Sequence, residues 1–390
     1  MINISGMNRS KCSGCCACVN VCPKLCISME LDQEGFYYPV VDEQKCVKCG
    51  LCEKTCKLTK SLKSENNPVA YACYNSDEKI RIKSSSGGMF TIFAEIILDS
   101  GGIVFGAAFD SDLSVHHICV DNKEDLHKLR GSKYVQSFIG ESYKQAKEFL
   151  KSGRPVLFSG TPCQIAGLHQ YLGDKYDNLY TVDIICHGVA SLKVWKAYLE
   201  YLEKIHKNKV DVAKYPSFRS KKQGYLDYGM EVYFENGVMY NETISSDKFM
   251  GLYLTNRILR PSCYRCDFKG VKRNSDITLA DFWGVDKLMP KMFDNKGTSL
   301  VLVNTLKGNK LFEEAKAESV YQQTEIKLVI PHNLSAVIST PKPFCRDKVF
   351  EDLDNVSPTD FFCNISYKKS FFEKVFQKLK YIYKKYTVKY

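Results

Sequence analysis

The chain contains 390 residues, of which 44% are hydrophobic and 12% aromatic, and this composition excludes a disordered protein. A chain of this length can form two or three domains, each with its own core. Its formal net charge of +11 would suit a nucleic-acid-binding protein, but eight lysines and one glutamate between Tyr367 and Tyr390 supply +7 of it. The charge is therefore concentrated in one segment and gives little support for nucleic-acid binding.

The 18 cysteines indicate a reducing, cytoplasmic location in which the sulfur atoms bind metal, since no export signal is evident. The start of the chain lacks a basic segment followed by a long apolar region. The longest apolar stretch, Met89–Leu98, is interrupted by Thr91 and Glu95, so we expect no transmembrane helix.

Two identical runs of four cysteines lie near the start of the chain. They consist of Cys12, Cys15, Cys18 and Cys22, and of Cys46, Cys49, Cys52 and Cys56. The shared spacing C-x2-C-x2-C-x3-C is that of bacterial ferredoxins with two 4Fe-4S clusters. In such proteins the fourth cysteine of a run reaches the neighbouring cluster, so we expect Cys56 to complete the first set and Cys22 the second. Zinc sites and a disulfide scaffold are less favoured alternatives.

Residues 1–60 are thus predicted to form an α+β, ferredoxin-like module that holds two 4Fe-4S clusters. The polar, lysine-rich stretch Lys57–Pro68 reads as a linker, which would leave this module structurally independent.

From Val69 onward, short apolar strands alternate with helices, which indicates an α/β core with a largely parallel sheet. Strands are predicted at Val69–Tyr74, Ile103–Phe109, Val115–Val120, Pro155–Phe158 and Tyr180–Ile185. Helices are predicted at Met89–Leu98, Ser142–Lys151 and Ser191–His206, and another begins within GTPCQIAGL at 160–168. Asn236 and Gly237 lie between two apolar segments and predict a hairpin, so the sheet should be mixed.

Four further cysteines lie at predicted strand or loop ends. They are Cys163, Cys186, Cys263 and Cys266. Any one of them alone would usually be a small buried hydrophobe. Four thiolates are what a third 4Fe-4S cluster needs, and turns at the carboxyl ends of parallel strands converge on one crevice. Zinc in the same cage is the alternative. The remaining six have no evident partner: Cys16, Cys26, Cys73, Cys119, Cys345 and Cys363.

Six motifs follow one another in the order known from one protein family. They are SSSGGMF at 84–90, RGSKYVQS at 130–137, GTPCQIAGL at 160–168, DIICHGVAS at 183–191, RPSCYRCDF at 260–268 and SDITLADFWG at 275–284. Through them the chain resembles the coenzyme F420 hydrogenase/dehydrogenase beta-subunit family. In its fused ferredoxin module it resembles those members that occur in exopolysaccharide biosynthesis.

The resemblance implies an α/β flavoprotein core that binds FAD beside a 4Fe-4S cluster, with the cluster held by Cys163, Cys186, Cys263 and Cys266. Residues 66–152 would be the N-terminal part of this flavin domain. Residues 153–345 would be its C-terminal part, with the third cluster and FAD.

Several motif residues suit a flavin site. The SSSGG segment precedes a helix and offers hydroxyls and free amides to a pyrophosphate, and other motifs add a cation and aromatic rings. The candidates are Ser85, Ser86, Gly87, Gly88, Ser132, Lys133, Tyr134, Thr161, Asp281 and Trp283. Each has an ordinary alternative as a loop, a surface turn or a core residue.

Residues 346–390 are predicted to form a basic amphipathic tail. Between Phe371 and Tyr386, apolar residues recur at helical spacing with lysines between them. Such a helix suits an anionic membrane surface or a partner groove, and docking on the chain's own core is the alternative. Peripheral membrane contact is therefore possible in an otherwise cytoplasmic protein.

Together these features predict an FAD- and 4Fe-4S-dependent oxidoreductase. Electrons would pass between a soluble carrier, ferredoxin or a deazaflavin, and FAD, which would reduce or oxidise an organic substrate or a deazaflavin-like cofactor. The alternatives are a beta-type subunit of a larger complex and a non-catalytic redox adaptor. Three clusters at about −2 each and FAD would lower the net charge to roughly +3, so we expect no nucleic-acid partner.

Overall fold

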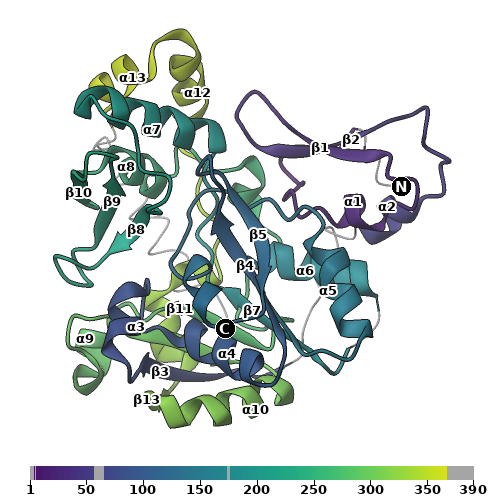
Figure 1. Ribbon diagram of the computed structural model, residues 1–390, viewed down its shortest axis with the longest axis vertical. Coiled ribbons are helices and arrows are strands. Elements are labelled where there is room, and N and C mark those ends of the chain that lie inside the picture. The colour runs from purple at the N-terminus through teal and green to yellow at the C-terminus, as the bar shows by residue number, and fades with distance from the viewer. Residues whose placement is uncertain (1–3, 5, 57–65, 174–175, 367–390) are drawn as a thin grey trace.

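The computed structural model describes residue 4 and residues 6–56, 66–173 and 176–366 (Figure 1). Eight strands form its central sheet: β3 (Val69–Asn75), β4 (Ile103–Phe109), β5 (Val115–Val120), β6 (Val156–Gly160), β7 (Leu179–Ile184), β11 (Ile277–Asp281), β12 (Ser299–Val303) and β13 (Ser319–Thr324). Their order is β13-β3-β12-β11-β7-β6-β4-β5. The contiguous strands β11, β7, β6 and β4 run parallel, and the other neighbouring pairs are antiparallel. The predicted mixed sheet is confirmed, whereas the expectation that it is largely parallel is wrong.

Helices cover both faces of this sheet. They are α4 (Met89–Asp99) and α10 (Leu306–Ala315) on one face, with α5 (Ser142–Lys151), α6 (Pro162–Leu172), α9 (Val285–Leu288) and α11 (Ile326–Val329) on the other. Val104 of β4 packs toward α4, and its neighbour Phe105 packs toward α5 and α6, as the alternation of side chains along a strand requires. The strands and helices for which bounds were predicted lie within two residues of those bounds, whereas β11, β12, β13 and α10 were not predicted.

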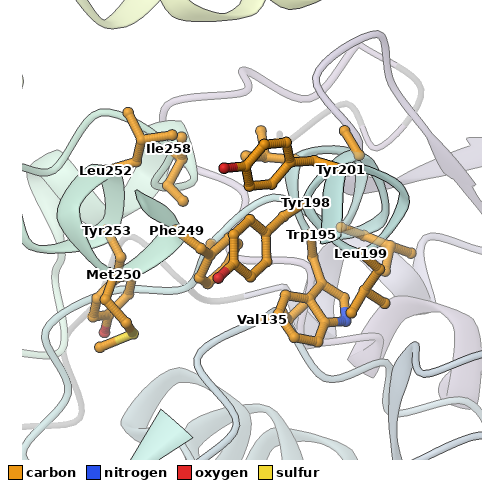
Figure 2. Packing of buried hydrophobic residues seen from close by; sticks show 14 of the residues in the cluster. Val135, Trp195, Tyr198, Leu199, Tyr201, Phe249, Met250, Leu252, Tyr253 and Ile258 are labelled. Carbon is orange, nitrogen blue, oxygen red and sulfur yellow. The ribbon is translucent and has the colours of Figure 1, made fainter. Parts of the chain in front are cut away.

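A second, smaller unit packs beside the carboxyl ends of the parallel strands. It consists of the antiparallel strands β8 (Ser217–Ser220), β9 (Gly229–Tyr233) and β10 (Met239–Thr243) with helices α7 (Leu192–His206), α8 (Lys248–Leu254), α12 (Arg346–Asn355) and α13 (Pro358–Asn364). Figure 2 shows its aromatic core, in which Trp195 and Tyr198 of α7 meet Phe249 of α8. The predicted hairpin at Asn236-Gly237 is confirmed, but it belongs to this separate sheet.

The first part of the predicted tail belongs to the fold. Helices α12 and α13 lie within residues 346–366, and the Phe362 ring contacts Tyr198 and Tyr201 of α7. The amphipathic stripe predicted from Phe371 to Tyr386 lies outside the described residues. No helix in the part of the chain that the structure describes is long and apolar enough to span a membrane.

The cysteine-rich N-terminal segment forms a small α+β unit. It contains α1 (Ala17–Val21), the antiparallel pair β1 (Ile27–Leu31) and β2 (Tyr37–Val41), and α2 (Leu51–Thr55). In Figure 1 this unit, in purple, lies beside α5 and α6.

This N-terminal unit is docked on the core through buried polar contacts, so the expected structural independence of the module is wrong. Arg346 of α12 makes a two-pronged ion pair with Glu34, and the Ser191 hydroxyl donates to the Glu34 carbonyl at 2.5 Å. Asn20 of α1 donates to the Gly140 carbonyl at 2.8 Å. Because these contacts come from several separate segments, the module and the core form one packed structure.

Candidate iron-sulfur and flavin site

The two N-terminal cysteine runs have the same backbone conformation. In the first run Gly14 and Cys16 have positive φ angles of 69° and 61°. In the second run Lys48 and Gly50 occupy the equivalent positions, with φ angles of 54° and 72°. In each run the third cysteine lies in a short helix, and the fourth caps the end of that helix. The repeated spacing therefore folds into two copies of one loop.

The first cysteine set surrounds a small apolar pocket. Cys12, Cys15 and Cys18 line it together with Cys56, which comes from the second run. The fourth cysteine of the second run thus lies where the crossed pattern puts it. Gly167 of α6 lines the same pocket, so this set faces the core.

The second set lies on the outer side of the module. Cys22, Cys46 and Cys52 share one cluster of packed side chains, and Cys49 is exposed. The sequence analysis gave Cys26 no partner, but its Sγ atom lies 3.4 Å from that of Cys22. Cys26 lies four residues beyond Cys22 and outside the repeated spacing, so the spacing gave no signal for it.

The four cysteines of the predicted third set line one large pocket. Cys163 is in the first turn of α6 after β6, and Cys186 follows β7. Cys263 and Cys266 come from a short 3-10 helix, Pro261–Arg265, and its end. The pocket encloses about 710 Å³ of empty space, part of it open to solvent. Parallel strands β6 and β7 end at the same edge, which explains why residues far apart in sequence meet here.

The pocket of the third cysteine set is strongly cationic. Its walls include Lys11, Arg260, Arg265, Lys269 and Arg273, against one carboxylate, Asp267. Lys269 donates to the Cys186 carbonyl at 2.6 Å. Such a lining suits an anionic occupant, because a buried positive charge needs compensation.

Burial makes the thiols of this pocket hard to ionise when no metal is bound. It raises the pKa of Cys163, Cys186 and Cys263 to about 12 each, and the neighbouring thiolates add to the effect. A metal centre deprotonates the thiols that coordinate it, so four thiols in a cationic pocket fit the donor chemistry of a 4Fe-4S cluster.

The arrangement differs from that of a single-ion site. Within the described residues, no three His, Cys, Asp or Glu side chains are grouped so that they could hold a metal ion. The sulfurs around one zinc ion would stand about 3.8 Å apart, from the Zn–S bond length and tetrahedral geometry. Each thiolate of a cubane cluster binds a different iron, so its ligands stand farther apart.

Several of the predicted flavin residues lie close to one another in the structure. The Ser132 amide donates to the Ser85 hydroxyl at 2.7 Å, which joins two of the motifs. A Cβ atom on Gly87 would lie 2.4 Å from the Cys73 carbonyl, so this loop can approach the sheet only with glycine. Gly88 has a φ of 86° and directly precedes α4.

Thr161 belongs to the cysteine pocket instead. Its hydroxyl lies 3.1 Å from Cys163 Sγ, and it forms the capping box that begins α6. The Lys133 amino group donates to the carbonyls of Lys128 and Arg130, so it fastens its own loop.

The sequence analysis missed the residues that link the flavin candidates. Arg219 of β8 donates to Asp281 at 2.9 Å and to the Ser85 carbonyl at 3.3 Å. Its guanidinium carbon lies 3.6 Å from the centre of the Tyr228 ring and 5.3 Å from that of Trp283. No local motif marks Arg219, since β8 reaches this place only through the packing of the smaller unit on the core.

A second buried cation lies beside Arg219. Lys221 donates to the carbonyls of Arg81, Ser86 and Lys296. Burial lowers the pKa of Lys221 to about 7. Tyr225 completes the group, because its hydroxyl donates to Asp281 and its ring stacks on Trp283. We call Arg219, Lys221, Tyr225, Tyr228, Asp281 and Trp283 the arginine-aromatic cluster.

Comparison with known proteins places this chain in a family. Residues 70–141 match the family described as coenzyme F420 hydrogenase/dehydrogenase, beta subunit N-term, and residues 153–328 match the corresponding C terminus. The coenzyme F420-dependent sulfite reductase of Methanocaldococcus jannaschii is 27% identical over 241 residues, which cover 56% of this chain. The chain matches only 36% of the length of that relative.

A solved structure of the F420-reducing [NiFe] hydrogenase complex from Methanosarcina barkeri contains a similar chain. It has a TM-score of 0.44 and 18% identity, and the match covers 77% of this chain and 90% of that one. The two family matches together extend over most of the central sheet and the cysteine pocket. The chain described here belongs to the coenzyme F420 hydrogenase/dehydrogenase beta-subunit family.

Proposed function

We propose that this chain is an iron-sulfur flavoprotein oxidoreductase with three 4Fe-4S clusters and one FAD. The observation that carries the proposal is the convergence of Cys163, Cys186, Cys263 and Cys266 on one cationic pocket. The same pocket is lined by Lys11 and Ser13, which flank Cys12 of the first cysteine set. Membership in a family of hydrogenase and dehydrogenase subunits supports electron transfer as the activity.

The residues divide into three iron-sulfur sets. Cys12, Cys15, Cys18 and Cys56 would hold the first cluster, Cys22, Cys46, Cys49 and Cys52 the second, and the pocket cysteines the third. Clusters of this kind supply one-electron chemistry. The first set faces α6, and the second faces outward with Cys49 exposed, so an external carrier meets the second set.

The arginine-aromatic cluster and the SSSGG loop would bind FAD, which supplies the change from one-electron to two-electron chemistry. Arg219 and Lys221 provide positive charge beside the glycine loop before α4. Buried cations at such a loop suit a pyrophosphate. Trp283 and Tyr225 offer stacked aromatic surfaces for a ring system.

The substrate is proposed to be an organic molecule or a deazaflavin-like cofactor, and reduced ferredoxin or a deazaflavin the carrier. The match to an F420-dependent sulfite reductase supports the deazaflavin. A role in polysaccharide biosynthesis is proposed from the sequence resemblance. A second candidate, an electron-transfer subunit that serves a separate catalytic partner, is supported by the family, which is defined by beta subunits.

The proposal is tested by cofactor content. Protein purified without oxygen should carry about twelve irons, twelve acid-labile sulfides and one FAD per chain. Cys263→Ser should lose about four irons and keep FAD. Cys119→Ser is the matched control, because Cys119 is half-buried and outside the three sets, and it should lose none. Stoichiometric zinc in place of four irons would contradict the third cluster.

Turnover separates the candidate functions. With bound FAD, reduced deazaflavin or ferredoxin should bleach the flavin absorbance, and an added acceptor should restore it. Turnover of a small acceptor by the isolated chain supports the enzyme. Flavin reduction that requires a partner protein for reoxidation supports the subunit role. A chain without flavin would support the redox adaptor instead.

A further inference from the structure

The buried arginine Arg260 joins two of the cysteine sets. Its backbone belongs to the third set: its carbonyl accepts the Cys263 amide at 2.9 Å, and its amide donates to Val189, three residues after Cys186. Its side chain points into the first set, where Nε donates to the Cys12 carbonyl at 2.9 Å. One residue therefore spans the boundary between the N-terminal module and the core.

The guanidinium of Arg260 is fixed in place on all sides. Nη1 donates to Gln136 Oε1 at 2.8 Å, and Nη2 donates to the Tyr37 carbonyl at 2.9 Å. A Cβ atom on Gly14 would lie 3.1 Å from Nη1, so the loop of the first set lies directly against the guanidinium. The Tyr38 ring centre lies 4.2 Å from its Cζ atom. These contacts hold the guanidinium in place, and Arg260 is 1% exposed.

Arg260 has no acidic partner among the residues that the structure describes. Of the five other buried arginines, four are each paired with a carboxylate: Arg81 with Asp294, Arg219 with Asp281, Arg273 with Asp183 and Arg346 with Glu34. The fifth, Arg257, is 7% exposed and donates to the Ser366 carbonyl. Arg260 bonds only to two carbonyls and an amide. Burying a cation without a counter-ion costs free energy, and a negative charge beside it would offset this cost.

The nearest sources of that negative charge are the cysteine sets. Arg260 lines the pocket of the third set and contacts Gly14 between Cys12 and Cys15. Four thiolates and a 4Fe-4S core carry a net negative charge, which increases by one when the cluster gains an electron.

We propose that Arg260 is a shared counter-charge and positioning residue that holds the first and third cysteine sets side by side and raises the reduction potentials of both their clusters. This inference rests on the proposed function, because it needs clusters in both sets. A fixed cation stabilises the reduced, more negative form of a neighbouring cluster, so its removal should lower the potential. The second set, with Cys49 exposed on the outer side of the module, should be little affected.

The test measures the three cluster potentials by redox titration with electron paramagnetic resonance on anaerobically purified protein. In Arg260→Gln, two of the three potentials should move to more negative values while the third stays at its wild-type value. Gln136→Glu should move the same two in the same direction, because it gives Arg260 a carboxylate at the 2.8 Å contact without removing the arginine. This second variant keeps the test valid if Arg260→Gln does not fold.

Arg346→Gln is the matched control. Arg346 is also buried, at 2% exposed, and also fastens the module, but its charge is paired with Glu34 and it does not line the cysteine pocket. The three cluster potentials of the Arg346→Gln protein should match those of the wild type. The inference is overturned if all three potentials shift together, if none shifts in a folded Arg260→Gln or Gln136→Glu protein, or if Arg346→Gln gives the same shift. Wild-type protein without iron in these sets would instead overturn the proposed function.

Discussion

In the arginine-aromatic cluster, the stability of the fold depends on how each buried charge is paired. Arg219 is 4% exposed and its cost of burial is offset by Asp281 and by the rings around it. Removing one partner of a buried ion pair leaves the other charge without compensation, which is far more costly than losing an exposed pair.

We therefore predict that Asp281→Ala lowers the free energy of unfolding by about 3 to 5 kcal/mol, and also weakens FAD retention. Asp99→Ala, which removes an exposed ion pair with Lys123, should change it by less than about 1 kcal/mol. Both free energies can be measured by chemical denaturation. Equal effects of the two substitutions would show that Arg219 does not depend on Asp281.

A second residue-scale prediction concerns pH. Burial raises the pKa of Asp247 from 3.8 to about 6, and the carboxyl accepts hydrogen bonds from Tyr198 and Tyr240. Because the folded-state pKa lies above the unfolded value, folding takes up a proton. The stabilisation from this group is therefore complete below pH 3.8 and lost as the pH rises through about 6.

Between pH 5 and pH 7.5 this group should cost the wild type about 1.4 kcal/mol of its free energy of unfolding. Asp247→Asn keeps the cap on α8 but cannot titrate. The difference in unfolding free energy between wild type and variant should thus change by this amount over that range. A difference that is constant with pH would mean that Asp247 is ionised in the folded chain.

At the scale of elements, the first cysteine loop of the module packs closely against α6. A Cβ atom on Gly167 of α6 would lie 2.9 Å from Tyr143 Oη and 3.0 Å from Cys15 Cβ. The helix can approach the cysteine loop only because this position lacks a side chain. The same helix carries Cys163, so one element contributes to both the first and third sets.

We predict that Gly167→Val costs about 1 to 3 kcal/mol in unfolding free energy through overpacking and removes about four irons, those of the first set. Gly173→Ala is the control on the same helix. It strains a residue with a φ of 71° but would meet no atom within 4 Å, so it should leave the iron content unchanged. Full iron content in Gly167→Val would show that the loop can move away from α6.

At the scale of the whole molecule, the N-terminal module and the smaller aromatic unit both pack against the sheet core. The N-terminal module, the sheet core and the smaller aromatic unit each contribute residues to the cysteine pocket or to the arginine-aromatic cluster. The residues proposed to bind the clusters and FAD end at Trp283, whereas the predicted amphipathic stripe begins at Phe371. The proposed cofactor sites and any membrane contact of the tail can therefore be tested separately.

Deletion of Phe371 to Tyr390 should abolish sedimentation with anionic lipid vesicles, and salt should weaken the binding of the full chain. The iron and FAD content should stay the same, because the residues proposed to bind them end at Trp283. Vesicles without anionic lipid are the control. If the full chain ignores anionic vesicles even at low salt, the membrane proposal is wrong.

The sequence by itself determined many of the local elements and predicted the three cysteine sets. Periodicity predicted five of the eight central strands and the helices α4, α5 and α7 to within two residues, since each of these segments is long enough to show its buried faces. The cysteine spacing predicted two equivalent loops, because the repeated spacing imposes the same turns. The family motifs predicted the four pocket cysteines, but their meeting in one pocket depended on the parallel order of β6 and β7.

Only the tertiary structure decided what surrounds those sets. Arg219, Lys221 and Arg260 carry no local signal, because each acts on partners that are far away in the sequence. The docking of the module is also a tertiary result: a lysine-rich linker reads as a flexible joint, whereas Arg260 and Arg346 bury their charges at the interface. Buried charge requires specific partners in space, and a one-dimensional pattern does not record which residues those are.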